Sequence, residues 1–239
     1  LGNGRFDLPR IMENAPAGLT LGDPNVQFMD INGEGKADLV VTHPGILAGY
    51  FPTRFNAEWD VRSFQKFPVA PSFSLFDPDV KLIDLNGDGI TDAIRAGSRM
   101  ELFFYDPAEG WQPPLLIPRQ DDLAAFPNVI FTDPRVRFAD MNGDGLQDIL
   151  MIYDGNVEYW PYMGYGRWGQ RIHMRNSPRF PYGYDPRRIL MGDIAGDGPS
   201  DIIYVEDNKI TLWINQNGNG FSEPVEILGT PPVSDLDAV

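Results

Sequence analysis

A pattern of apolar and polar positions occurs four times along the chain. Each copy begins with a short alternating stretch whose apolar residues are Val26/Phe28, Val80/Leu82, Val136/Phe138 and Ile189/Met191. An acidic, glycine-containing segment follows, and after it comes an almost continuous apolar run such as DILMI. Alternation with a period of two is typical of a half-buried strand, and a continuous run is typical of a buried one. Each copy therefore predicts a β-hairpin with the acidic segment as its turn.

Aromatic residues predict two further strands in each copy. The first aromatic lies 20 residues after the leading aspartate of the acidic segment, at Tyr50, Phe104, Trp160 and Trp213. The second opens a fourth segment and is found at Trp59, Trp111, Trp168 and Phe221. Four strands in a repeat of about 54 residues have the size of one β-propeller blade, in which each small sheet packs against its neighbours.

The predicted fold class is therefore all-β: a β-propeller of four-stranded blades, with residues 1–239 as one domain or a fragment of one. The four repeats are expected over residues 26–66, 80–118, 136–176 and 189–228. The stretch GNGRFDLPRIM near the start resembles GNGFSEPVEI at the end of the fourth copy. Residues 1–14 are thus predicted to be the outer strand of a preceding blade, in a propeller that is either larger than this chain or incomplete.

The acidic turns are candidate calcium sites. Ca²⁺ prefers six to eight oxygen ligands, and alternate positions of a tight loop direct their side chains inward. The predicted ligands are Asp84, Asn86, Asp88, Asp92 and the carbonyl of Ile90 in the second copy, Asp140, Asn142, Asp144, Asp148 and the carbonyl of Leu146 in the third, and Asp30, Asn32, Glu34 and Asp38 in the first. The longer Glu34 is expected to fit less well than an aspartate.

In the fourth copy Ala195 brings no oxygen beside Asp193, Asp197 and Asp201, so that site is expected to be the weakest or empty. An EF-hand is excluded, because its twelfth loop position needs a glutamate and none of the copies has one there. A purely structural alternative remains, in which Asn and Asp form Asx-turns and glycine supplies positive φ. Structural calcium is the favoured prediction for the second and third copies.

Composition narrows the range of functions. The chain has 19 basic and 34 acidic residues, a net charge of −15, and no cysteine. Such a charge repels phosphate backbones and anionic lipid, so nucleic acid is not an expected partner. No run of about 18 apolar residues occurs, so direct membrane insertion is not expected. The two histidines, His43 and His173, lie in different copies with no evident partner, and the usual nucleophile and phosphate-loop motifs are absent. The chain is therefore predicted not to be an enzyme.

Residues 156–188 of the third copy are basic and aromatic in an otherwise acidic chain. Tyr, Trp, Met and Arg are the residue types enriched at protein interfaces. Tyr159, Trp160 and Trp168 fit the core of a blade. The predicted protein-contact residues are Tyr162, Tyr165, Arg167, Arg171, Arg175 and Arg179. The alternative is that these arginines only form ion pairs with acidic residues nearby.

The repeated acidic motif is similar to the integrin-like FG-GAP/VCBS repeats. The stretches VRFADMNGDGLQDILMI, YWPYMGYGRWGQRIHMRNSPRF, DPRRILMGDIAGDGPSDIIYV and LWINQNGNGFSEP more specifically resemble the propeller of TcB-type components of insecticidal ABC (Tc) toxin complexes, which are related to SpvB-like virulence proteins. The resemblance covers essentially the whole chain, and the aromatic and arginine-rich stretch is its most specific part.

This resemblance implies a role in a secreted bacterial toxin complex. In that family the B component joins a TcC-type component to form an Rhs-repeat shell around a toxic enzyme. The propeller docks on a TcA-type translocation channel and gates release of the toxin. The chain lacks the SpvB region and the shell repeats of that family. A different hypothesis is a secreted integrin-like or lectin-like adhesion module that binds glycan or protein.

Overall fold

The structure is a computed structural model that describes residue 8 and residues 11–43, 47–56 and 58–233. Within these residues, helix is limited to two 3-10 turns, η1 (Val61–Ser63) and η2 (Pro186–Arg188). No helix of the described part is long and apolar enough to cross a membrane. The regular structure is otherwise entirely β.

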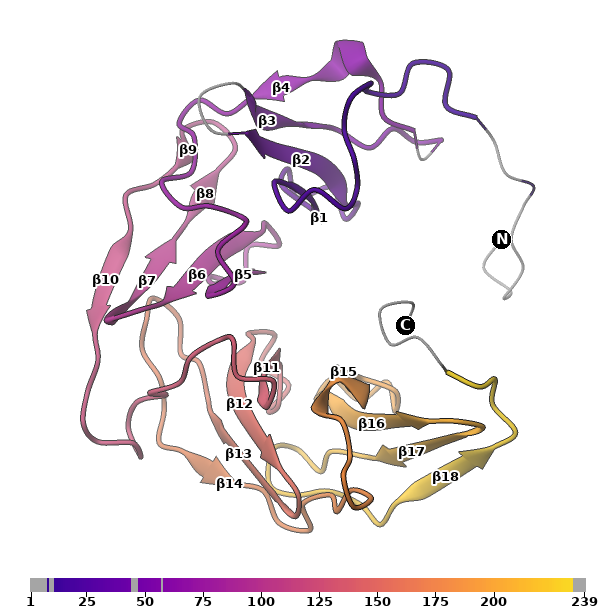
Figure 1. Cartoon of the computed structure of the whole chain (residues 1–239). Helices are drawn as coiled ribbons and strands as arrows, with labels where there is room; N and C mark the ends of the chain where they lie inside the picture. Colours follow the sequence, from indigo (N-terminus) through magenta and orange to yellow (C-terminus); the bar gives the residue numbers. More distant parts are fainter. Residues whose placement is uncertain (1–7, 9–10, 44–46, 57, 234–239) are drawn as a thin grey trace. The chain divides into compact units, whose positions relative to one another are not determined.

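The strands form four antiparallel sheets of four strands, here called blades 1 to 4 (Figure 1). Blade 1 contains β1 (Val26–Met29), β2 (Asp38–His43), β3 (Leu47–Phe51) and β4 (Gln65–Lys66). Blade 2 contains β5 (Val80–Ile83), β6 (Asp92–Ala96), β7 (Arg99–Phe103) and β10 (Leu115–Pro118). Blade 3 contains β11 (Val136–Ala139), β12 (Asp148–Tyr153), β13 (Asn156–Trp160) and β14 (Ile172–His173). Blade 4 contains β15 (Ile189–Gly192), β16 (Asp201–Glu206), β17 (Lys209–Trp213) and β18 (Val225–Leu228). These sheets confirm the predicted all-β fold of β-propeller blades.

The burial of the first strand in each blade differs from the simple alternation that the sequence predicts. In β1 the residues at both ends, Val26 and Met29, are buried, whereas Phe28 is 47% exposed. β1 is an edge strand, bonded on one side to β2 only, and its two buried residues lie on opposite faces of the sheet. The second strands β2, β6, β12 and β16 have buried centres, as expected from their apolar runs.

The aromatic column of the third strands is shifted in two blades relative to the prediction. The residues that pair in register with the first apolar residue of the second strand are Phe51, Phe103, Trp160 and Trp213. The predicted Tyr50 lies one residue before this position, and Phe104 lies one residue after it. The hairpin between the second and third strands therefore differs in length between copies, which a fixed spacing cannot reveal.

The chain divides into two compact units, which are described separately. One unit is Leu1–Asp77 with Gly89–Thr91 and Tyr105–Gln112; it holds blade 1 and an additional hairpin of β8 (Tyr105–Asp106) and β9 (Gly110–Trp111). In this unit Val26, Leu39, Val41 and Phe51 form one core, covered by Leu19, Trp59 and Phe64. One face of blade 1 is thus covered by segments of its own unit.

The other unit holds blades 2, 3 and 4. Blade 3 packs on blade 4 through Leu150, Ile152, Val157 and Tyr159, which meet Ile202, Tyr204 and Trp213 in one buried cluster. Blade 2 packs on blade 3 in the same way, through Ile94, Ala96, Met100 and Leu102. The packing residues occupy equivalent register positions in the two blades, so the same face of each sheet meets the following sheet.

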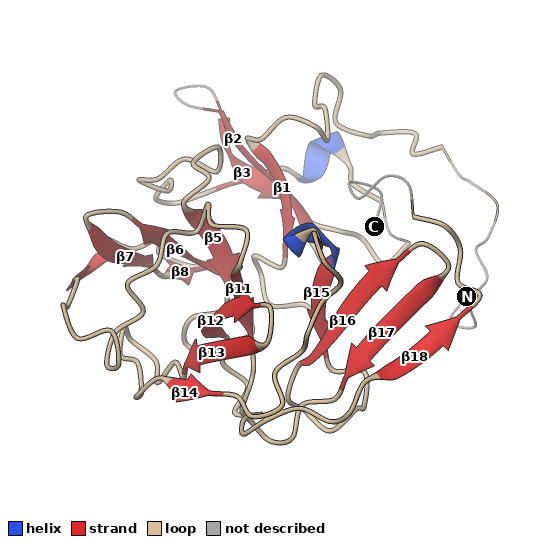
Figure 2. Ribbon diagram, turned by 60° about the horizontal axis from the view of Figure 1, so that its bottom comes forward, coloured by secondary structure: helices blue, strands red, loops and turns tan. Residues whose placement is uncertain are grey.

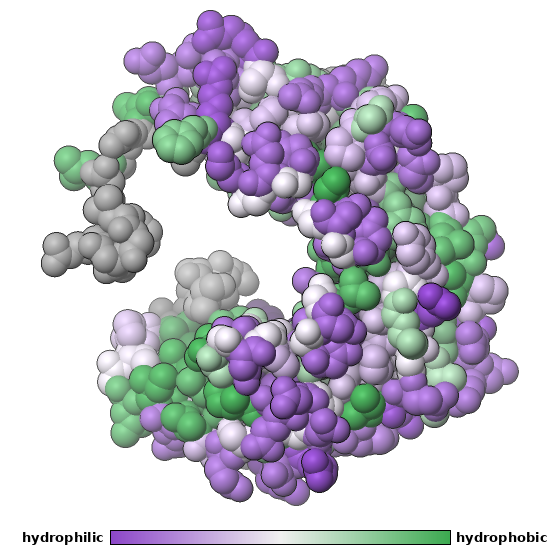
Figure 3. Space-filling model, turned by 180° about the vertical axis from the view of Figure 1, so that it is seen from behind, coloured by the Kyte–Doolittle hydropathy of each residue, from purple (hydrophilic) through white to green (hydrophobic). Residues whose placement is uncertain are grey.

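The equivalent face of blade 4 is less covered. Its corresponding residues are Ile203, Val205, Ile210 and Leu212, and their row continues to Leu190 and Val225 at the sheet edges. Leu190 is 36% exposed and Val225 is 50% exposed. Hydrophobic side chains accordingly gather at the surface over this blade (Figure 3), while its antiparallel strands β16 to β18 are seen most clearly in Figure 2.

The predicted outer strand at residues 1–14 falls mostly on residues outside the described ranges. Membership of a larger propeller stays a prediction.

Truncating a residue to alanine at the same register position should destabilise the chain more in blade 3 than in blade 4. Leu150 is fully buried between blades, so Leu150→Ala should lower the free energy of unfolding by about 2–5 kcal/mol. Ile203 occupies the same register position in blade 4 but is only half-buried. Ile203→Ala should therefore lower the free energy of unfolding by clearly less. Urea unfolding of both variants measures the difference. Equal costs would contradict the packing described.

Candidate functional site

The last aspartate of each acidic turn is buried and binds backbone N–H groups. Asp148 is fully buried, and its carboxylate accepts from the N–H of Met141 at 3.0 Å and of Tyr162 at 2.7 Å. Asp201 accepts from Ile194 at 2.9 Å and from Asn215 at 2.8 Å. One carboxylate thus ties the turn to the chain that leaves the third strand. The burial also raises the pKa of Asp148 to about 7, against the opposing effect of these two N–H groups.

The first aspartate closes the turn itself. Asp140 accepts from the N–H of Gly143 at 2.7 Å and of Gly145 at 2.8 Å. Asp193 accepts in the same way from Gly196 at 2.6 Å and Gly198 at 3.0 Å, although this turn has Ala195 in place of the asparagine. The side-chain oxygen that the fourth copy lacks is therefore not needed for the shape of the turn.

Successive turns also contact one another. The N–H of Ser200, in the fourth turn, donates to the carbonyl of Asp140, in the third, at 2.7 Å. A Cβ added at Gly143 would lie 3.3 Å from Pro199, so this glycine allows a close approach between the turns. The Asn215 side chain adds a 2.9 Å bond to the carbonyl of Met141. The turns thereby connect blade 3 to blade 4.

The predicted calcium ligands lie together on these turns, but their oxygens are engaged in hydrogen bonds. In the third turn the Asn142 side chain donates to Asp144 at 2.9 Å, and Asp144 also accepts from the N–H of Leu146. The second turn repeats the bond between Asn86 and Asp88 at 2.8 Å, and in the first turn Asp30 accepts from the N–H of Glu34. Across the described ranges, no three acidic or histidine side chains are placed to share a metal ion. Calcium binding by these turns stays a prediction.

The predicted protein-contact residues divide into buried and exposed ones. Tyr162 is 2% exposed and its ring packs on Trp168, so this residue belongs to the core, contrary to the prediction. Tyr165 and Arg167 are exposed on a turn between β13 and β14. Arg171 is half-buried, with its guanidinium 3.5 Å from Glu158 and 5.7 Å from the centre of the Trp160 ring.

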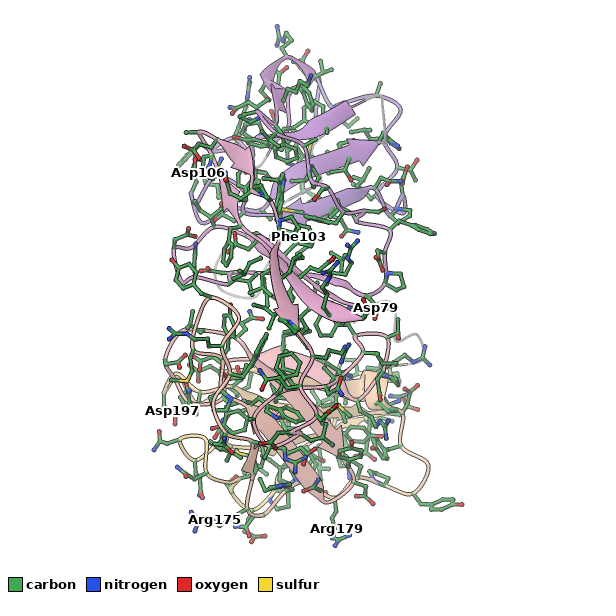
Figure 4. The ribbon with its side chains drawn as sticks, turned by 90° about the vertical axis from the view of Figure 1, so that its left-hand side faces the viewer. Asp79, Phe103, Asp106, Arg175, Arg179 and Asp197 are labelled. Atoms are coloured by element: carbon green, nitrogen blue, oxygen red, sulfur yellow. The ribbon has the colours of Figure 1, made fainter. Side chains whose placement is uncertain are left out.

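Arg175 and Arg179 are exposed and point outward from the blade (Figure 4). Neither guanidinium forms an ion pair with an acidic side chain of the described residues, whereas Arg135 and Arg187 pair with Asp133 and Asp185. Binding of protein by the exposed arginines stays a prediction.

Each histidine has an acidic neighbour, although the sequence indicated no partner for either of them. The Nε2 atom of His43 lies 3.5 Å from Asp23, and the Nδ1 atom of His173 lies 3.3 Å from Glu158. The His173 side chain is 57% exposed. His173 and Arg171 both lie next to Glu158, so the three residues form an ion-pair cluster. The cross-strand register of β13 and β14 places His173 opposite Glu158, and the sequence did not fix that register.

Replacing the buried aspartate of the fourth turn should strongly destabilise the fold, although this turn lacks a full set of calcium ligands. Asp201→Ala removes the acceptor of the Ile194, Ala195 and Asn215 N–H groups, and should lower the free energy of unfolding by about 2–4 kcal/mol. The exposed Asp197 is the control, and Asp197→Ala should change the free energy of unfolding by less than about 0.5 kcal/mol. Urea unfolding with chelator and with Ca²⁺ should give the same difference. A loss seen only with Ca²⁺ would show a metal role instead.

Calcium binding predicts a stability gain that depends on the second and third turns. At a free Ca²⁺ concentration of 100 times Kd, the chelator-treated chain should gain about 2.7 kcal/mol for a site that binds the folded state only. The double variant Asp88→Asn/Asp144→Asn should lose this gain, whereas Asp197→Asn should keep it. Calorimetry and thermal melting measure both effects. No heat and no shift in Tm on adding Ca²⁺ to the unmodified chain would rule the prediction out.

Comparisons with known proteins agree with this geometry. Residues 140–204, from the third acidic turn to β16, match the FG-GAP-like repeat family. The chain matches no curated protein sequence. Among solved structures it is similar to the Photorhabdus luminescens Tc holotoxin pore, with a TM-score of 0.72 and 28% identity, covering 93% of this chain and 10% of that chain. The TcdB2–TccC3 complex with Cdc42 matches 87% of this chain and 12% of that chain at 24% identity, with a TM-score of only 0.48.

A lectin from Agrocybe aegerita that recognises non-reducing terminal N-acetylglucosamine is also similar, with a TM-score of 0.55 and 17% identity over 84% of this chain and 51% of that chain. At this identity the likeness shows the fold alone. The chain spans only about a tenth of the length of the toxin chain it matches. The sequence-based recognition is confirmed: these β-propeller blades carry an FG-GAP-like repeat and resemble a region of the Tc toxin complexes.

Proposed function

We propose that this chain is a non-catalytic β-propeller region of a TcB-like toxin component, which docks on a TcA-type translocation channel and gates release of an encapsulated toxin. The observation that carries the proposal is the likeness to the Photorhabdus luminescens Tc holotoxin pore, at 28% identity over 93% of the chain. The match covers 10% of the toxin chain, so the shell around the toxin would come from other regions and from a TcC-type partner. The complex would be secreted.

The chemistry of the described residues supports a role without catalysis. The carboxylates of the acidic turns hold backbone N–H groups, and this use recurs in several copies. A catalytic group would instead be needed once, in one asymmetric site. His173, the more exposed histidine, lies in a surface ion-pair cluster with Glu158 and Arg171.

The distribution of charge supports protein binding. The chain carries a net charge of −15, yet exposed arginines without acidic partners among the described residues gather in blade 3 and its exit segment. Opposite charges across an interface favour docking and its specificity. These arginines offer separate positive contact points for acidic regions of another protein.

Direct binding to the channel is the test. The 239-residue chain should bind the purified TcA-type channel of its toxin complex, and the affinity should fall as salt rises because charge pairs contribute to docking. Biolayer interferometry with immobilised channel measures both effects, with a glycan array in parallel. No binding to the channel, together with specific binding to N-acetylglucosamine-terminated glycans, would replace the proposal by a lectin-like function.

A further inference from the structure

One turn of blade 3 exposes residues of the types that protein interfaces favour. This turn, residues 163–167, leaves β13 and leads to β14 with the sequence MGYGR. Met163 is 61% exposed and Tyr165 is 63% exposed, and Arg167 is also exposed. Arg167 has no ion-pair partner within the described part of the chain. The turn therefore exposes a thioether, a phenol ring and a guanidinium on three residues that are separated by single glycines.

The turn is held in one conformation by its own hydrogen bonds. The N–H of Met163 donates to the carbonyl of Arg167 at 2.9 Å, and the N–H of Arg167 donates to the carbonyl of Gly164 at 3.2 Å. The hydroxyl oxygen of the buried Tyr162 accepts from the N–H of Gly166 at 3.1 Å. A turn fixed in this way loses little further conformational entropy when it binds.

The neighbouring blade also fixes the turn. A Cβ added at Gly166 would lie 2.5 Å from the Ile117 side chain in β10, so the glycine fits closely against blade 2. The Tyr165 ring leans on Phe104, with 5.6 Å between the ring centres. Most of the Tyr165 side chain nevertheless remains exposed.

The equivalent turn of blade 4 shows that the fold does not require these side chains. There, the N–H of Gly218 donates to the Asn215 side chain, as the N–H of Gly166 does to Tyr162. Tyr165 and Gly166 have φ values of 50° and 73°, and Asn217 and Gly218 have 51° and 72°. The bridges Tyr162–Trp168 and Asn215–Phe221 close turns of equal length, so blade 4 places Gly218 where blade 3 places Tyr165. Glycine tolerates positive φ far better than tyrosine, so the tyrosine is kept at a conformational cost.

We infer that residues 163–167 form the docking knob by which this chain binds its channel partner. Tyr165 and Met163 enter an apolar socket of the partner, and Arg167 pairs with a carboxylate at the rim of the socket. Rigid aromatic and arginine side chains of this kind carry most of the binding energy in many interfaces. The inference rests on the proposed function and adds to it the contact residues and the chemistry of the partner surface.

The substitution Tyr165→Asn tests the inference by removing the exposed ring and installing a residue that tolerates positive φ. Because asparagine suits the φ value of this position, Tm should stay unchanged or rise by about 1–4 °C. Binding to the purified TcA-type channel should weaken by about 10-fold or more, as expected for loss of an aromatic anchor. Biolayer interferometry and thermal melting of the full 239-residue chain measure the two effects. The matched control is Gln216→Ala in the exposed turn of blade 4, which should leave the affinity within about 2-fold.

The outcomes separate this inference from the proposed function. If the unmodified chain binds the channel and Tyr165→Asn binds equally well, the inference is wrong and the proposed function stands. If the unmodified chain does not bind the channel, both are wrong. Should Tyr165→Asn lower Tm, the pair Met163→Gln and Arg167→Gln provides a second test away from the strained position. Both should weaken binding, and Arg167→Gln should also reduce its dependence on salt.

Discussion

A buried carboxylate at the end of each acidic turn is the interaction on which this structure depends. Asp148 and Asp201 are each completely enclosed, and each receives N–H groups from the turn and from the chain after the third strand. Burying a carboxylate is costly unless several donors surround it. Once those donors are in place, the carboxylate fixes where the turn lies and where the connection to the fourth strand begins. The position of the MGYGR turn follows from this, because the N–H of Tyr162 is one of the donors to Asp148.

Apolar contacts between sheets supply the second constraint. The same register positions of blades 2 and 3 form the buried clusters that join each to the following blade. Blade 1 covers one of its faces with Leu19, Trp59 and Phe64. On blade 4, the row that is equivalent to the packing rows of blades 2 and 3 ends in the exposed residues Leu190 and Val225. Repeat architectures need such terminal faces covered or made polar to remain soluble. Blade 4 thus leaves apolar side chains exposed at the edges of this row.

The sequence predicted the fold well because its strongest signal, a fourfold recurrence of apolar runs around an acidic turn, comes from the strands themselves. Details that depend on pairing were harder to predict. The aromatic column was displaced at Tyr50 and Phe104, since hairpin length varies between copies. Tyr162 was predicted to contact another protein, but its side chain is buried, and its backbone N–H donates to Asp148. Met163 was overlooked because only the three-dimensional turn, and not the composition, distinguishes it from the many apolar residues nearby.

The fourth acidic turn has a consequence for how such blades can diverge. It keeps the same backbone bonds as the third although Ala195 replaces the asparagine. The backbone shape of the turn therefore does not depend on an oxygen-bearing side chain at this position. A copy can therefore lose an oxygen-bearing side chain at this position and still keep the backbone bonds that shape its turn.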